Sequence, residues 1–149
     1  MLLAASCIGP QELPAPAAAA HYDQVREDVI AAVGAEDLGL TMHEEPFVTT
    51  EEGECVFDPG SWEAGEELFT GDETSWRPLL DPLNGVLAQH GFEQAREFDY
   101  TNGQAFGISV ADDHGLRLRV YVLEGSTKVS MHGAEIDDAD GCSAEALGL

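Results

Sequence analysis

Hydrophobic residues recur with a helical period in the first half of the chain and with a strand period in the second. Val25, Val29 and Val33 are spaced four residues apart, and Gly34 follows them directly. Residues on one face of an α-helix have this spacing, and glycine commonly ends a helix. We therefore expect a helix over 21–34 that buries one face.

A second helix is expected in the middle of the chain, ending at His90-Gly91. It is predicted to begin near Ser75 or Asp81, because Pro78 and Pro82 fit best within a first helical turn. The helix end places His90 where it interacts favourably with the helix dipole. The residues of the buried stripe share a helical spacing and are Leu79, Leu83, Val86, Leu87 and His90.

From Arg96 onward the hydrophobic period falls to two, as in strands that bury one face. Turn sequences interrupt this pattern at Asn102-Gly103, at 112–115 and at 124–126. Asn-Gly is a strong signal for a two-residue hairpin turn. We therefore expect an antiparallel meander of about four strands, whose apolar face needs helices to cover it.

The expected fold is α+β, a two-layer sandwich in which two helices cover one face of this meander sheet. Residues 35–75 are expected to form an irregular acidic stretch, with brief strands at Phe47-Val48 and 55–57. Residues 1–20 are assigned to an N-terminal segment and residues 21–149 to a single domain.

The net charge of the chain excludes several classes of function. The 149 residues include 6 Lys and Arg against 29 Asp and Glu, so the net charge is 6 − 29 = −23. Such a chain cannot bind nucleic acids by neutralising phosphates, and anionic membrane surfaces repel it. No apolar run is long enough for a transmembrane helix.

The first seven residues, MLLAASC, resemble the end of a bacterial lipoprotein signal, with small residues directly before Cys7. The basic start and most of the apolar stretch of a full signal are missing. Leu3 lies four residues before the cysteine, where the usual spacing is three. We expect Cys7 to be lipidated, with the Pro/Ala-rich residues 8–20 as a tether; the alternative is an ordinary cytosolic N-terminus.

The other two cysteines, Cys55 and Cys142, form an even pair within the domain. A disulfide between them would tie the acidic stretch to the end of the sheet and contribute roughly 4 kcal/mol in the chain-entropy model. Such a bond persists in an oxidising compartment. The alternative is a pair of buried reduced thiols in a cytosolic protein.

The order of these features resembles small actinobacterial cell-envelope lipoproteins of the LppA-like kind. The resemblance covers most of the chain and implies an envelope location and a fold more than an activity. The shared features are Cys7, the early helix, Cys55, the helix Trp76…Leu79…Leu83…Leu87…Gly91-Phe92, the strand start Gly115-Leu116-Arg117-Leu118 and Cys142.

No catalytic or cofactor motif accompanies this pattern. The sequence lacks GxSxG, GxGxxG and GxxxxGKS, and its five histidines have neither HExxH nor HxH spacing. The acidic run 137–141 fails as an EF-hand, because Ile136 and Leu147 would occupy ligand positions. We therefore expect no enzyme activity, no metal and no cofactor, and we expect His114 to be a solvent-exposed turn residue.

One sheet face gathers basic residues. If alternate residues of 116–122 face the helices, Arg117, Arg119 and Tyr121 project from the other side, together with Lys128, Ser130 and His132 of the next strand. This arrangement predicts a platform for an anionic or polar ligand. The alternative, favoured by charge balance, is that the acidic residues 36–73 fold across these cations and neutralise them.

The sequence thus predicts a monomeric, lipid-anchored extracytoplasmic domain without enzyme activity. Its partner would be an envelope protein, an envelope polymer or a small ligand, bound through the sheet face and the acidic stretch. The alternative is a cytosolic acidic interaction or inhibitor protein that binds a basic partner and keeps Cys55 and Cys142 reduced.

Overall fold

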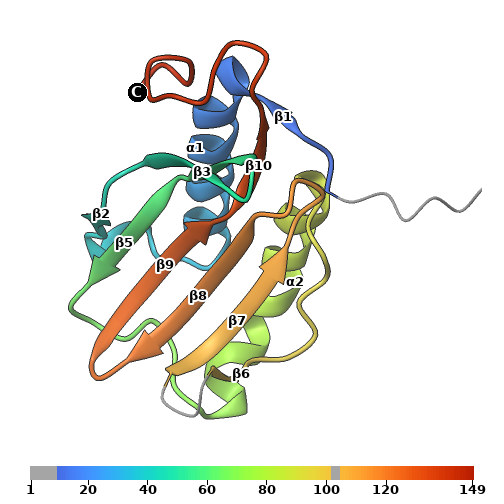
Figure 1. Ribbon diagram of the computed structural model, residues 1–149. Coiled ribbons are helices and arrows are strands. Elements are labelled where there is room, and N and C mark those ends of the chain that lie inside the picture. Colours follow the sequence, from blue (N-terminus) through green and yellow to red (C-terminus); the bar gives the residue numbers. More distant parts are fainter. Residues whose placement is uncertain (1–9, 102–104) are drawn as a thin grey trace, which may run out of the picture.

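The computed structural model of the protein describes residues 10–101 and 105–149. In this part of the chain, two α-helices accompany ten strands, which form one six-stranded and one four-stranded sheet (Figure 1). The predicted α+β class is confirmed. The prediction of a single four-stranded sheet is wrong, because the acidic stretch contributes strands to both sheets.

The six-stranded sheet contains the predicted meander and two further strands from the acidic stretch. All of its strands pair antiparallel. The expected turn at Asn102-Gly103 lies outside the described residues, although Thr101 pairs with Ala105 on either side of it. In spatial order the strands are β2 (Thr41–Glu44), β5 (Gly60–Ala64), β9 (Ser126–His132), β8 (Arg117–Leu123), β7 (Ala105–Ala111) and β6 (Asp99–Thr101).

The four-stranded sheet joins the two ends of the chain to the acidic stretch. Its first strand runs parallel to its neighbour, and the other pairs are antiparallel. Cys55 and Phe57 alternate with less buried residues, so this sheet also has a core side. In spatial order its strands are β1 (Leu13–Pro14), β10 (Ala134–Asp137), β4 (Glu54–Asp58) and β3 (Phe47–Glu51).

The two sheets meet at a corner, because two strands of one sheet continue directly into the other. β4 leads into β5 across Pro59, and β9 leads into β10 across Gly133. At the corner, the Gly133 N–H donates a hydrogen bond to Asp58 Oδ1 over 2.7 Å. Gly133 has φ +87°, a left-handed conformation that glycine adopts without steric cost.

Helix α1 (Ala15–Ala32) begins six residues earlier than the sequence pattern predicts, and so includes part of the expected tether. Alanine is the best helix former, and Pro16 lies in the first turn, where a missing N–H costs least. Ala15 and Ala18 are buried, so this extra turn packs against the core.

Helix α2 (Glu73–Gln89) contains Pro78 and Pro82 in its interior, whereas we expected both prolines in a first turn. Each proline removes a helical hydrogen bond. Two contacts near the start of the helix offset this loss. Asp72 Oδ1 accepts a hydrogen bond from the Thr74 N–H over 2.9 Å, and the Trp76 ring stacks on Phe98 at a centroid distance of 5.3 Å.

Both helices lie on the same side of the six-stranded sheet (Figure 1). Side chains from the helices and from both sheets form one buried cluster. Tyr22 of α1 faces Phe57 of β4, and Phe69 packs edge-on against Phe98 at 4.7 Å between centroids. The two predicted helices are therefore present on one side of the six-stranded sheet, and within the described residues neither helix covers its other face.

Candidate functional site

Within the described residues, neither helix covers the second face of the six-stranded sheet (Figure 1). Alternate residues of β8 are fully buried on the helix side, which turns the residues between them outward. The neighbouring strand β9 also buries Thr127, Val129 and Met131; of the residues between them, Lys128 and His132 are half-buried and Ser130 is buried beneath its neighbours. We call the six outward-facing residues of these two strands the open face: Arg117, Arg119, Tyr121, Lys128, Ser130 and His132.

The register of the two strands brings these residues into cross-strand pairs. Arg117 lies opposite His132, Arg119 opposite Ser130, and Tyr121 opposite Lys128. Directly opposed side chains in an antiparallel sheet have Cβ atoms about 4.5–5.5 Å apart. The residues that the sequence predicted to share a face therefore do lie together, and their binding of a ligand stays a prediction.

Two open-face residues, Lys128 and His132, have acidic partners from the 36–73 stretch. Lys128 Nζ lies 3.8 Å from Glu63 Oε2, and His132 Nδ1 lies 4.0 Å from Asp58 Oδ1. Both carboxylates are on strands that extend the sheets sideways, because β5 pairs with β9 and β4 pairs with β10. The acidic stretch therefore reaches the edge of the open face.

Arg117 and Arg119 differ from Lys128 in their surroundings. Both are exposed, and no carboxylate of the described residues lies within 4 Å of either guanidinium group. Arg117 Nη1 donates a hydrogen bond to Ser109 Oγ of β7 over 3.2 Å. The expectation that the acidic stretch folds across these cations thus fails for both arginines, because that stretch forms strands of its own.

The open face continues onto β7 and its edge. Gly107 and Ser109 of β7 lie opposite Tyr121 and Arg119. Beyond them is a hollow of about 400 Å³ between β7 and the 93–97 loop, with Arg96 among its lining residues. The hollow thus adds a third arginine beside the open face, together with the carboxylates of Glu93, Glu97 and Asp99.

A cluster of three histidines lies at one end of the helices, away from the open face. The His21 ring of α1 is 5.9 Å from the rings of His90 and His114, and its Nε2 atom is buried without a hydrogen-bond partner. His90 Nε2 donates to Asp28 Oδ2 over 2.8 Å. His114 Nδ1 donates to the Gln11 carbonyl over 2.7 Å, so the expectation of a purely solvent-exposed His114 is wrong.

Tyr22, next to His21, makes a buried hydrogen bond to Asp112. The Tyr22 hydroxyl donates to Asp112 Oδ2 over 2.8 Å, and Asp112 Oδ1 accepts from the backbone N–H groups of His114 and Leu116. Burial and the Asp112 carboxylate raise the pKa of Tyr22, so the phenol stays protonated. No sequence motif indicated this contact or the histidine cluster, because their members are far apart in the chain.

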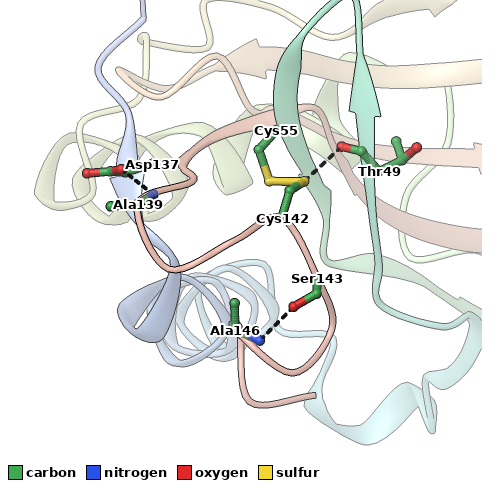
Figure 2. Close-up of a disulfide and its surroundings, with 7 residues drawn as sticks. All are labelled: Thr49, Cys55, Asp137, Ala139, Cys142, Ser143 and Ala146. Atoms are coloured by element: carbon green, nitrogen blue, oxygen red, sulfur yellow. Dashed lines mark hydrogen bonds between the residues drawn. A yellow bond between two sulfur atoms is a disulfide. The ribbon is translucent and has the colours of Figure 1, made fainter.

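The disulfide between Cys55 and Cys142 is present (Figure 2). It joins β4 to the segment after β10, with a Cα–Cα distance of 5.6 Å and 87 residues of separation. Cys142 Sγ also contacts the Thr49 carbonyl at 3.5 Å, although a bridged sulfur has no proton to donate. As predicted, the bond ties the acidic stretch to the end of the sheet, and such bonds are typical of oxidising compartments.

Other predictions concern anchoring and metals. Cys7, the expected lipidation site, lies outside the described residues. In the part of the chain that is described, neither helix is long and apolar enough to cross a membrane. Among the same residues, no group of three or more His, Cys, Asp or Glu side chains is placed to hold a metal ion.

Comparison with known proteins gives information about the fold only. No protein-family profile and no curated protein matches the chain. Among solved structures it is similar to a DUF4853 family protein from Actinomyces odontolyticus, with a TM-score of 0.57 and 18% sequence identity. The similarity covers 94% of this chain and 83% of the other. The expected likeness to an actinobacterial protein is thus supported at the level of the fold.

Proposed function

We propose that this protein is an extracytoplasmic binding domain without enzyme activity, anchored in the cell envelope through a lipid on Cys7. Its open face would bind an anionic group of a partner protein, an envelope polymer or a small ligand. The actinobacterial cell-envelope lipoproteins that the sequence resembles provide the setting for this proposal.

The observation that carries the proposal is that Arg117 and Arg119 are exposed and have no carboxylate partner among the described residues. The chain has 29 acidic residues against 6 Lys and Arg, so a cation can readily find a carboxylate within the same molecule. Among the described residues, Arg26, Arg77 and Lys128 each do so, whereas the exposed Arg96 of the 93–97 loop does not. Two exposed arginines on adjacent outward positions of one strand do not, and their planar guanidinium groups are suited to carboxylates and phosphates.

The disulfide supports the extracytoplasmic part of the proposal. The competing hypothesis, a cytosolic acidic protein that binds a basic partner, requires Cys55 and Cys142 to be reduced. Their Cα–Cα distance of 5.6 Å lies in the ordinary range for a disulfide, and the bond is formed. This observation favours the envelope hypothesis over the cytosolic one.

NMR titration with two simple anions tests the binding surface. We expect citrate and pyrophosphate to shift the Arg117 and Arg119 side-chain Nε–H resonances. Arg119→Ala should weaken binding, and the double variant R117A/R119A should abolish it. Arg77→Ala, which removes an exposed arginine from α2, is the matched control. Equal binding by R117A/R119A and the wild type would remove the open face from the proposal.

The intact mass of the protein from its native cells, with and without reduction, tests the location. We expect cleavage before Cys7, added acyl chains and one disulfide. An unprocessed chain with three thiols would contradict the anchored, extracytoplasmic protein.

A further inference from the structure

Residues 10–12, the first that the structure describes, are held against the turn 112–115 by few contacts, whereas residues 13–14 form β1 and pair with β10. The Gln11 N–H donates to the Asp113 carbonyl over 2.8 Å, and the Gln11 carbonyl accepts from His114 Nδ1 over 2.7 Å. Pro10 lies against Gly115, where a Cβ atom would come within 3.2 Å of the proline ring. His114 is therefore the side chain that fastens this segment to the turn.

Electrostatic repulsion acts against this docking. Partial desolvation, and then the charges of Asp137 and Glu54, raise the pKa of Glu12. Desolvation is the larger cause and the neighbouring carboxylates add repulsion, so the charged form of Glu12 is disfavoured when the segment is docked. The two hydrogen bonds of Gln11 thus oppose a repulsion that is present at neutral pH.

Behind His114 lies His21, whose Nε2 atom is buried without a partner. His90 and His114 each lie 5.9 Å from it between ring centroids, and Tyr22 is 4.8 Å away. The Asp112 carboxylate also acts on His21, but its oxygens already accept three hydrogen bonds from other groups. Asp28 lies next to His90 and accepts a hydrogen bond from its Nε2–H group.

We propose that His21, His90 and His114 form a pH-responsive switch that holds residues 10–12 on the turn 112–115 at neutral pH and releases them on acidification. A protonated His21 would be a cation whose Nε2–H group is buried without an acceptor, between two further histidines. Rotation of the His114 ring toward solvent lets water reach His21 Nε2 and supply the missing acceptor. The rotation breaks the bond to the Gln11 carbonyl and frees the segment.

The direction of the pH effect follows from His21. Burial, with His114 and His90 contributing, lowers its pKa from the ordinary 6.5, and Asp112 only partly opposes this. The released state has the more ordinary pKa and binds the proton first, so docking weakens as the pH falls below about 6.5. Asp28, whose pKa is lowered from 3.8 by its bond with His90, loses its charge only at much lower pH.

The Gln11 amide reports on docking, because its N–H is bonded only in the docked state. We expect its hydrogen-exchange protection, corrected for intrinsic exchange, to fall between about pH 7.5 and about pH 5. The fall should be roughly tenfold for each unit by which docking lowers the His21 pKa. Core amides of β8 should keep their protection over the same range.

Three variants assign the effect. His21→Phe keeps an aromatic ring but cannot be charged, so Gln11 should stay protected at the lower pH. His114→Phe lacks the donor to the Gln11 carbonyl, so protection should be low at both values. His43→Phe is the matched control, because His43 is exposed, pairs only with Glu63, and lies on β2; it should behave like the wild type.

Two results would overturn the proposal: pH-independent protection of Gln11 in the wild type, or an unchanged loss of protection in His21→Phe. If that variant does not fold, NMR titration of the wild-type His21 ring decides. Its midpoint should lie below the ordinary histidine value of about 6.5 and coincide with the loss of Gln11 protection. A midpoint that does not coincide with this loss contradicts the switch.

Discussion

At Gly107 of β7, the sheet beside the open face has no room for a side chain. It lies opposite Tyr121, and a Cβ atom built on it would come within 2.1 Å of the Val120 carbonyl oxygen and 2.5 Å of Tyr121 Cα. These are backbone atoms in the middle of the sheet, so they cannot move aside without disturbing the β7–β8 pairing.

Gly107→Ala is therefore expected to destabilise the protein by about 1–3 kcal/mol, as overpacking in a rigid region does. Gly85→Ala is the control, because Gly85 lies in α2 with no atom within 4 Å of a built Cβ. It should stabilise the protein by about 0.5–1 kcal/mol. Urea unfolding measures both, and equal effects would contradict the close approach at Gly107.

Sequence patterns predicted which residues of one strand share a face. They did not predict contacts between residues of different helices, strands and turns. Arg117 and Arg119 were assigned to one face because strand side chains alternate with a period of two. His21 and His114 are 93 positions apart, and neither belongs to a motif. Only the packing of α1 against the 112–115 turn brings them together, and a period in the sequence carries no information about that packing.

At the scale of elements, the meander was predictable and the strands of the acidic stretch were not. The buried residues of β8 alternate strictly, which gives a clear strand pattern. All four residues of the edge strand β2 are exposed, so that strand has no such pattern. β5 has four buried residues out of five and sits between β2 and β9. Its position depends on pairing with a strand more than 60 residues away.

The disulfide is an element-scale constraint on this stretch. It closes a loop between residues 87 positions apart and fastens the chain after β10 to β4. Replacing both cysteines, as C55A/C142A, should lower the free energy of unfolding by roughly 4 kcal/mol. Chemical denaturation of the variant and of the oxidised wild type measures this difference. A reduced wild type that is as stable as the oxidised protein would contradict a structural role for the bond.

At the scale of the whole molecule, the net charge of −23 opposes folding through self-repulsion. Salt screens this repulsion, since the Debye length falls from about 30 Å at 0.01 M to about 10 Å at 0.1 M. We expect Tm at neutral pH to rise by several degrees over this range. Near the isoelectric point of about 4.1 the salt effect should vanish. A salt-independent Tm at neutral pH would mean that the carboxylates are too far apart to interact.

The corner between the two sheets couples their unfolding. Because β4 continues into β5 and β9 into β10, with Asp58 bonded to Gly133 at the bend, each sheet supplies half of the same two long strands. Separating the four-stranded sheet would pull directly on the central strands of the six-stranded one. The domain should therefore melt in a single calorimetric transition, and strain applied to the N-terminal segment would pass through the pairing of β1 with β10 and then along the backbone from β10 into β9 of the open face.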